Sequence, residues 1–158
     1  MESSEYPFLS VIIPVYNDNA GLKKLLPTLM QQSYPQDKYE VIVVDNGFNQ
    51  DVTEVTKGFE VKLLTENDIQ SSYAARNKGI QQAVGEVFVF IDSDCRAVED
   101  WLYEGIKKMQ QVGSDLVGGN VVFSFSEKNP TFVYWLASNP LVRLKREAPW
   151  NELLVLLK

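Results

Sequence analysis

The sequence predicts one α/β domain built on a mostly parallel sheet with helices on both faces. Short apolar, β-branched segments alternate with segments whose apolar residues recur at helical spacing. Strands that alternate with helices of this size form a parallel sheet with right-handed crossovers. The 158 residues, of which 45% are hydrophobic, are enough for one globular domain with its own core.

Four segments are predicted to be strands, because each is rich in β-branched or aromatic residues and ends in turn-forming polar residues. In chain order they are Leu9–Pro14, Tyr39–Val44, Val61–Leu64 and Val87–Ile91. A fifth predicted strand, Leu116–Phe123, contains paired glycines. Such a pair is typical either of a bulge or of a backbone that closely approaches a ligand or another strand.

The helix predicted between the first two strands carries one apolar stripe and an interior proline. Asp18 or Asn19 can cap its amino end. Pro27 lies inside the pattern, and an interior proline costs a helix about 3 kcal/mol. We therefore expect a kink or a break near Leu26, unless a late start places Pro27 in the first turn.

Two later helices have recognisable ends. Ser71 or Ser72 can cap a helix that stops at Gly85, because glycine readily ends a helix. After the fourth strand, a helix that begins near Trp101 is expected to stop near Gly113. A helix is thus expected between each pair of consecutive strands.

The pattern changes after residue 125. Asn129–Pro130 can start a helix that Pro140 ends, and residues 141–158 mix basic and apolar side chains. The segment Leu153–Leu157 is apolar on all sides, so we expect it to be buried in this chain, against another chain, or at a membrane surface. We therefore divide the chain into residues 1–125 and an incomplete or aberrant part, residues 126–158.

The composition excludes several kinds of chemistry. The chain has no histidine, so carboxylates must carry any acid–base chemistry, and histidine-ligated zinc is excluded. The single cysteine, Cys95, excludes an intrachain disulfide and is compatible with a reducing compartment. A net charge of −6 without a basic block argues against nucleic acid as a partner. Because no secretory signal or membrane-length apolar stretch is evident, a cytoplasmic domain is expected.

The fourth strand ends in two carboxylates, Asp92 and Asp94, one residue apart. Open α/β sheets bind ligands at the carboxyl ends of their strands. Two like charges about 4 Å apart repel by about 4 kcal/mol near a protein surface, and Mg²⁺ or Mn²⁺ would turn this repulsion into attraction. A metal and phosphate site is therefore predicted, and the alternative is a strand-end turn with a helix cap.

Three other polar segments follow strands and are expected to converge on the same edge of the sheet. Tyr16 either packs at that edge or stacks on a nucleobase, and Asn17 either starts the helix or lies at the ligand. Asp45 either completes a turn or accepts a base N–H. Arg76 and Lys78 either are solvated helix charges or face a diphosphate.

Taken together, four motifs resemble those of family 2 glycosyltransferases in order and spacing, from about Leu9 to Phe123: SVIIPVYND, VIVVDNG, SYAARNKGI and FVFIDSDC. These are inverting enzymes with the nucleotide-diphosphosugar-binding GT-A fold. The resemblance implies that residues 1–125 form the nucleotide-sugar-binding half and that residues 126–158 begin the acceptor-binding part. It implies a nucleotide-diphosphosugar donor, a UDP-sugar first, and a glycan, lipid or protein acceptor of unknown identity.

The resemblance also assigns the base end of the site. Tyr16 matches the residue beside the nucleobase, Pro14 shapes its loop, and Asn17 lies next to it in the same motif. Asp45 matches the acid that hydrogen-bonds the base. Asn46 departs from the second aspartate that is frequent in the family.

At the metal end, Asp92 corresponds to the first acid of the DxD motif, near the ribose and a metal-bound water. Asp94 corresponds to the acid that ligates Mn²⁺ or Mg²⁺, which bridges the diphosphate. Arg76 and Asn77 match a segment near the donor. The metal would act as a Lewis acid on the leaving diphosphate.

The carboxyl-terminal part departs from the family. Inversion needs a general base. In the family that the motifs resemble, this base is an aspartate or glutamate that lies beyond a further strand and helix. Glu147 and Glu152 are the only acids after Glu127, and neither follows a recognisable strand. The catalytic base is therefore expected to be absent, and the chain to be the donor-binding part of a transferase, truncated at its carboxyl end. Such a chain would lie in the cytoplasm, with membrane contact or self-association through Leu153–Leu157.

Two alternatives compete with this interpretation. In a haloacid-dehalogenase-like phosphatase, Asp92 would be the nucleophile and Asp94 the acid–base, although that motif usually opens its domain and here follows the fourth strand. In the second alternative, the chain is a non-catalytic nucleotide-sugar-binding fragment whose Leu153–Leu157 segment engages a partner.

Overall fold

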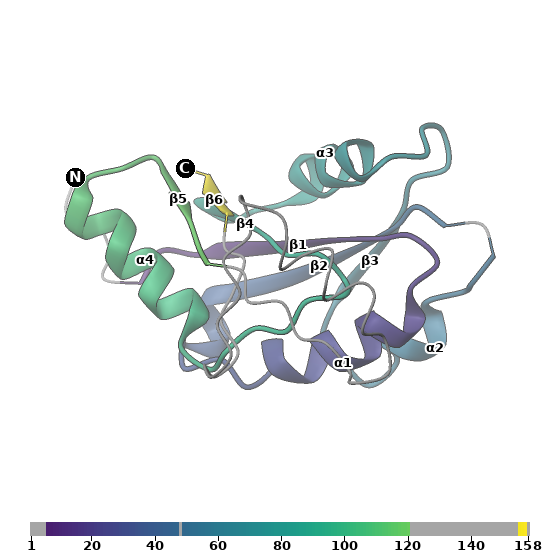
Figure 1. Cartoon of the computed structure of the whole chain (residues 1–158), viewed down its shortest axis with the longest axis horizontal. Coiled ribbons are helices and arrows are strands. Elements are labelled where there is room, and N and C mark those ends of the chain that lie inside the picture. Colours follow the sequence, from purple (N-terminus) through teal and green to yellow (C-terminus); the bar gives the residue numbers. More distant parts are fainter. Residues whose placement is uncertain (1–5, 48, 121–154, 158) are drawn as a thin grey trace, which may run out of the picture.

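A six-stranded sheet with the strand order β3-β2-β1-β4-β6-β5 forms the centre of the protein (Figure 1). In the computed structural model, residues 6–47, 49–120 and 155–157 are described. The sheet contains four parallel strands: β1 (Leu9–Val15), β2 (Tyr39–Asp45), β3 (Lys62–Thr65) and β4 (Val87–Phe90). The sequence-based prediction of a mostly parallel sheet is therefore confirmed.

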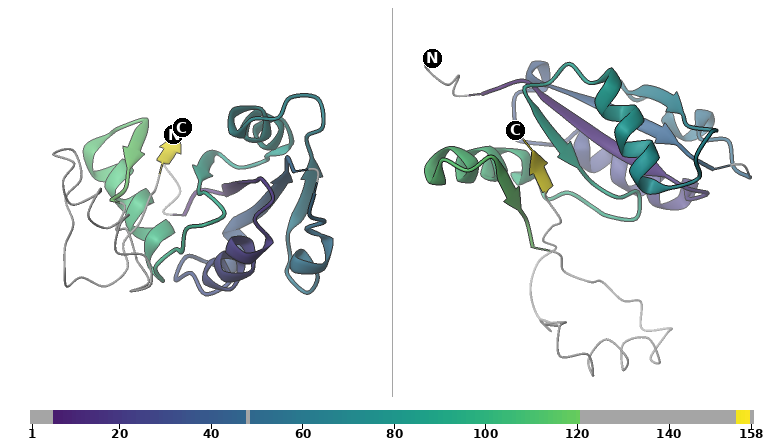
Figure 2. Two further views of the ribbon diagram at one scale, coloured as in Figure 1. Left: turned by 45° about the vertical axis from the view of Figure 1, so that its right-hand side comes forward. Right: turned by 90° about the horizontal axis from the view of Figure 1, so that it is seen from above.

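Helices cover both faces of this sheet, as Figures 1 and 2 show. The helical segments are α1 (Asn19–Leu29), a 3₁₀ turn (Gln36–Lys38), α2 (Thr53–Thr56), α3 (Ser72–Gln82) and α4 (Trp101–Val112). Helix α3 packs on one face, where Ala75 meets Ile12, Ile42, Val44 and Phe90. Buried residues of α1 and α4 belong to the larger core on the other face.

The alternating side chains of β1 explain how one strand serves both cores. Val11 and Ile13 point into the larger core, whereas Ile12 belongs to the smaller one. This is the two-residue period of a strand that is buried on both sides. Gly79 lets α3 approach closely, since an added Cβ there would lie 2.5 Å from Cγ2 of Ile12.

The predicted caps form, but α3 ends at Gln82, before its predicted stop at Gly85. Asp18 caps α1 by accepting a hydrogen bond from the Gly21 N–H, and Ser71 caps α3 through the Ala74 N–H. Gly113 ends α4 with a φ of 60°, a left-handed conformation that glycine adopts without steric cost.

Of the kink or break expected near Leu26, the break is wrong, because α1 continues through Pro27 to Leu29. Pro27 lies close to the end of the helix, and Leu25, Leu26 and Leu29 are fully buried. Burial of such a leucine side chain contributes about 1.5–3 kcal/mol, so the apolar stripe offsets the cost of one proline.

The chain order places a topological switch point between β1 and β4. After β1 the chain adds β2 and then β3 on one side, and it returns to pair β4 with the other side of β1. The connections that leave β1 and β4 at their carboxyl ends therefore diverge. Open α/β sheets bind their ligands in the crevice at this position.

Two short strands complete the sheet beside β4. Of the predicted strand Leu116–Phe123, residues 116–118 form a strand, residues 119 and 120 do not, and residues 121–123 lie outside the described residues. Strand β5 comprises Leu116–Gly118, and β6 comprises Val155–Leu157. Strand β6 pairs antiparallel with both β4 and β5, so this part of the apolar segment joins the sheet of its own chain. The helix predicted from Asn129–Pro130 and the acids Glu147 and Glu152 lie outside the described residues.

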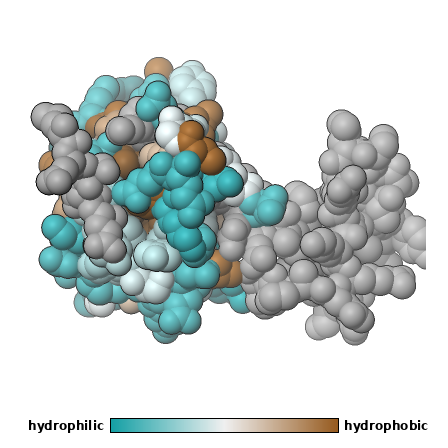
Figure 3. Space-filling view, turned by 90° about the vertical axis from the view of Figure 1, so that its left-hand side faces the viewer, coloured by the Kyte–Doolittle hydropathy of each residue, from teal (hydrophilic) through white to brown (hydrophobic). Residues whose placement is uncertain are grey.

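On the face at the α4 end, described hydrophobic residues are scattered among hydrophilic ones (Figure 3), as is usual for a protein surface. Within the described ranges, none of the helices combines the length and apolar composition needed to cross a bilayer.

The substitution Leu26→Ala tests the burial of the α1 stripe. Because Leu26 is fully buried, we expect the free energy of unfolding to fall by about 2–5 kcal/mol, as measured by urea denaturation. Val84→Ala is the matched control, since Val84 is 72% exposed, and it should change stability by less than about 0.5 kcal/mol. Equal effects of the two substitutions would contradict the packing of α1.

Candidate functional site

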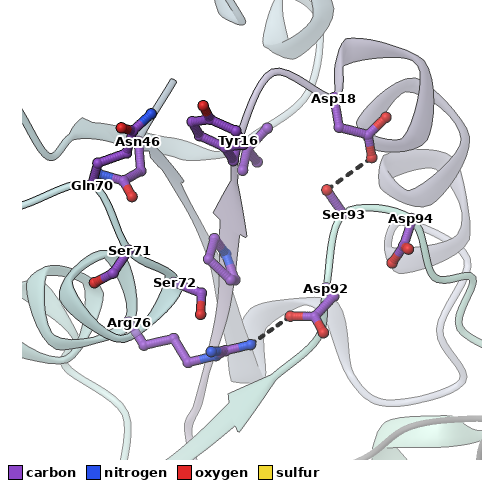
Figure 4. A pocket seen from close by; sticks show the side chains of 12 residues that line it. Tyr16, Asp18, Asn46, Gln70, Ser71, Ser72, Arg76, Asp92, Ser93 and Asp94 are labelled. Carbon is purple, nitrogen blue, oxygen red and sulfur yellow. Dashed lines mark hydrogen bonds and ion pairs between the residues drawn. The ribbon is translucent and has the colours of Figure 1, made fainter. Parts of the chain in front are cut away.

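A cleft of about 870 Å³ opens at the switch point, outside the carboxyl ends of β1 and β4 (Figure 4). It is lined by Pro14, Val15, Tyr16, Asp18, Asn46, Gln70, Ser71, Ser72, Arg76, Asp92, Ser93 and Asp94. These residues come from the end of β1, from the segments that follow β1, β2, β3 and β4, and from the amino-terminal half of α3. The predicted convergence of distant segments at one edge of the sheet therefore occurs.

The cleft has two walls. In Figure 4, Gln70, Ser71, Ser72 and Arg76, from the β3–α3 loop and α3, lie on one side. The loop after β4, with residues 92–94, lies on the other side. The end of β1 runs between the walls and carries Tyr16.

The two acids of the β4 loop have different surroundings. Asp92 accepts a hydrogen bond from the Arg76 guanidinium, with 2.5 Å between Nη2 and Oδ1. Asp94 is exposed and lines the cleft, and its Oδ1 accepts a long, weak contact of 3.8 Å from Sγ of Cys95. Asp92 is therefore paired with the positive charge of Arg76, whereas Asp94 is open to a ligand.

The local sequence pattern indicates only a helix cap at Asp18. Its Oδ1 accepts the Gly21 N–H at 2.9 Å, and its Oδ2 accepts the Ser93 hydroxyl, also at 2.9 Å. Gly21 is required for this approach, since an added Cβ would lie 2.7 Å from the Ser93 carbonyl oxygen. The acidic loop is thus fastened to the start of α1 through Asp18. A sequence shows the capping residue but not which loop shares its carboxylate.

The cleft carries an excess of negative charge. Three carboxylates, of Asp18, Asp92 and Asp94, line it with one guanidinium, that of Arg76. No group of three or more metal-ligating side chains occurs among the described residues. Asp92 and Asp94 nevertheless fit Mg²⁺ or Mn²⁺, because such ions are commonly bound by one or two carboxylates together with substrate phosphates and water.

The predicted base-end residues do not all line the cleft. Tyr16 does so and is 56% exposed. Asn17 has a φ of 49°, and its Oδ1 accepts the Asn49 N–H instead. Asp45 also lies outside the lining, and its carboxylate accepts the Gly47 N–H at 2.9 Å, as its turn alternative predicts. Asn46, the next residue, lines the cleft in its place.

The basic residues of α3 also separate. Arg76 faces the acidic loop, whereas the Lys78 ammonium lies 3.8 Å from Oε2 of Glu66. Lys78 and Asn77 are not in the lining. No local motif indicates that Gln70 is a site residue, because the course of the β3–α3 loop brings it to the cleft.

The pKa of the Cys95 thiol is affected by the charges of the acidic loop. Burial, followed by the negative charges of Asp94 and Asp92, raises the pKa of its thiol to about 11. The thiol is therefore protonated at neutral pH and is a poor nucleophile. Cys95 instead packs against the larger core as a partly buried side chain.

Comparison with known proteins gives a consistent result. Residues 10–155 match the family model described as glycosyl transferase family 2. Glycosyltransferase AglE of Haloferax volcanii is 44% identical over 128 residues, which are 78% of this chain and 42% of AglE. Glycosyltransferase GlyA of Streptococcus pneumoniae is 31% identical over 130 residues, 80% of this chain and 18% of GlyA. The chain thus spans less than half the length of these relatives.

Solved structures show the same architecture. The crystal structure of S. aureus TarS has a TM-score of 0.62 and 29% identity, over 69% of this chain and 20% of TarS. The mannosyltransferase PcManGT from Pyrobaculum calidifontis, in complex with GDP-Man and Mn²⁺, has a TM-score of 0.66 and 22% identity, over 96% of this chain and 44% of PcManGT. At that identity, the likeness to PcManGT shows the fold alone.

The reactivity of Cys95 tests the electrostatics of the acidic loop. With a pKa of about 11, we expect iodoacetamide to alkylate the native thiol at pH 8 at least about tenfold more slowly than in the urea-unfolded chain. Asp94→Asn removes one of the raising charges, so it should lower the thiol pKa and speed the native reaction. Alkylation of native and unfolded protein at the same rate would contradict the raised pKa.

Proposed function

We propose that this chain, which belongs to glycosyltransferase family 2, binds the nucleotide-diphosphosugar donor of an inverting transferase through a divalent metal. The fold is that of the GT-A glycosyltransferases. The observation that carries the proposal is the shared cleft, in which Tyr16 and the two acids Asp92 and Asp94 line one cavity. An aromatic ring and an acidic pair are the groups that a nucleobase and a metal-bound diphosphate require.

The charge of the cleft supports a metal-dependent site. A diphosphate alone would meet three carboxylates and one guanidinium, which is a repulsive field. Asp94 and Asp92 would hold Mn²⁺ or Mg²⁺, which when bound acts as a Lewis acid on the leaving diphosphate. That PcManGT was solved with GDP-Man and Mn²⁺ agrees with this assignment.

Arg76 is proposed to serve both the acid and the donor. Its guanidinium donates to Asp92 and has further N–H groups for a phosphate oxygen. The amino end of α3, at Ser71 and Ser72, lines the same wall. The backbone N–H groups and dipole at a helix start favour an anion there.

The base end of the site is assigned to Tyr16, Asn46 and Gln70. In Figure 4 the two amide side chains lie together near the tyrosine ring. The amide nitrogen of Asn46 donates to two backbone carbonyl oxygens, so its Oδ1 remains as an acceptor for a base N–H. Asp45, which the family resemblance assigned to this contact, bonds to Gly47 and stays a weaker candidate.

UDP is the first nucleotide to test. TarS has been solved in complex with UDP and with UDP-GlcNAc, and PcManGT with GDP-Man. We propose a UDP-sugar as the donor and leave the acceptor as a glycan, lipid or protein. The family match favours the transferase over the haloacid-dehalogenase-like phosphatase.

Calorimetric titration with UDP tests the metal site. We expect wild-type protein to bind UDP with Mn²⁺ and to bind it at least about tenfold more weakly in EDTA, a difference of about 1.4 kcal/mol. Asp94→Asn should remove most of the Mn²⁺ dependence, because Asp94 is the open carboxylate of the pair. Asp37→Asn, in the 3₁₀ turn before the amino end of β2, is the matched control and should bind as wild type does.

Absence of UDP and GDP binding with either metal would refute the donor site. Metal-dependent binding without sugar transfer would fit the non-catalytic alternative. Phosphate release from a simple phosphomonoester that is lost in Asp92→Asn would instead support the phosphatase.

Removal of the tyrosine ring tests the base end. Stacking of a base on an aromatic side chain is worth about 1–3 kcal/mol, so Tyr16→Ala should weaken UDP binding by about 5- to 150-fold. Tyr73→Ala is the matched control, because Tyr73 is 61% exposed and lies outside the cleft lining. Isothermal titration of both variants should separate them, and equal losses would rule out stacking on Tyr16.

A further inference from the structure

Glu66 is a buried carboxylate outside the cleft lining. It directly follows β3 and is only 8% exposed. Carboxylates are almost never buried unless they are paired or hydrogen-bonded. The proposed chemistry makes no use of Glu66, so its burial calls for another explanation.

The Glu66 carboxylate organises its own loop. Its Oε1 accepts hydrogen bonds from the backbone N–H groups of Asp68 and Ile69, at 2.8 and 3.1 Å. These two bonds and the nearby Lys78 of α3 lower the pKa of Glu66, so the carboxylate is ionised at neutral pH. Hydrogen bonds to an ionised acceptor are about twice as strong as those between neutral groups.

Asn46 fastens the same loop to the sheet. Its Nδ2 donates to the carbonyl oxygens of Glu66 and Ile69, at 2.8 and 3.0 Å. Its backbone N–H donates to the carbonyl oxygen of Val15 at the end of β1. Asn46 is only 3% exposed, so both donors act where water does not compete.

The held loop leads directly into one wall of the cleft. The Ser71 N–H donates to the Ile69 carbonyl oxygen, and the Ser71 side chain then caps α3. Gln70, Ser71 and Ser72 line the cleft, and α3 carries Arg76 to Asp92. The position of Ile69 therefore sets the start of α3 and the wall that follows.

We propose that Glu66 and Asn46 are positioning residues that hold the β3–α3 loop in place before any ligand arrives, so that the nucleotide diphosphate meets a preformed wall. This inference rests on the proposed donor site. A preformed wall matters because a loop ordered only on binding would cost affinity. Glu66 acts through the loop and touches no reacting atom.

Three variants at two positions test this arrangement. Glu66→Ala removes the acceptor of both loop N–H groups, whereas Glu66→Gln keeps an acceptor oxygen at the same reach. Glu54→Ala is the matched control, because the Glu54 side chain is 79% exposed and its ion-pair partner, Lys57, is a neighbour on the same short helix. Should Glu66→Ala fail to fold, Glu66→Asp replaces it. The aspartate side chain is shorter by one methylene group, so its carboxylate lies farther from the two loop N–H groups.

The first measurement is amide hydrogen exchange at Asp68 and Ile69 in ligand-free protein. We expect Glu66→Ala to speed exchange at both amides by at least about tenfold through loss of their acceptor, and Glu66→Gln to restore most of the protection. Titration of UDP with Mn²⁺ should give an affinity at least about fivefold weaker for Glu66→Ala and near wild type for Glu66→Gln and Glu54→Ala.

A pH series separates positioning from general stability. Because the pKa of Glu66 is lowered in the folded protein, its bonds persist at neutral pH and are lost as the pH falls through that value. The amide chemical shift of Ile69 should therefore move in wild type as the pH falls below about 4.3, the ordinary pKa of a glutamate, and should move far less in Glu66→Gln.

The outcomes distinguish the inference from the function on which it rests. If wild type binds UDP and Glu66→Ala binds it equally well, or if exchange at Asp68 and Ile69 is unchanged, the positioning role is wrong while the donor site stands. If wild type binds neither UDP nor GDP with Mn²⁺ or Mg²⁺, the proposed function and this inference fall together.

Discussion

The charge balance of the cleft constrains the whole molecule. Three carboxylates and a single guanidinium line a cavity at the switch point of the sheet, and such a group of acids repels a diphosphate unless a divalent cation is present. Two of the three acids are held by hydrogen bonds or an ion pair within the protein, and the third is exposed. Asp92 is paired with Arg76, and Asp18 is bonded to Ser93 and to the start of α1. Asp94, the exposed member of the three, is open to a ligand.

The rigid sheet makes this arrangement possible. Strands β1 and β4 are buried between two helix layers, so their carboxyl ends are fixed in position. The polar residues that directly follow these strands are therefore also held in place at the edge of the sheet. The close approach at Gly21 brings α1 against the acidic loop. Placement of the acids therefore depends on packing between elements that are far apart in the sequence.

The two walls of the cleft are held by different means. The acidic loop after β4 is fastened through side-chain contacts with Asp18 and Arg76. The loop before α3 is fastened through backbone groups that bond to Glu66 and Asn46. Asn46 can do this because an amide donates two hydrogen bonds, whereas an ionised aspartate at this position would donate none. The departure from the frequent family residue thus has a structural consequence in this chain.

The sequence by itself determined the class of fold, the parallel strands, the capping residues Asp18 and Ser71, and the acidic pair after the fourth strand, because periodicity and local hydrogen-bonding chemistry are written in neighbouring residues. It did not decide whether Pro27 would break α1, since that outcome depends on burial of the leucine stripe. Only the tertiary structure decided that Asn46 rather than Asp45 lines the cleft, that Arg76 rather than Lys78 faces the acids, and that Gln70 joins them. Each of these choices depends on contacts between segments that are distant in the chain, which local patterns do not encode.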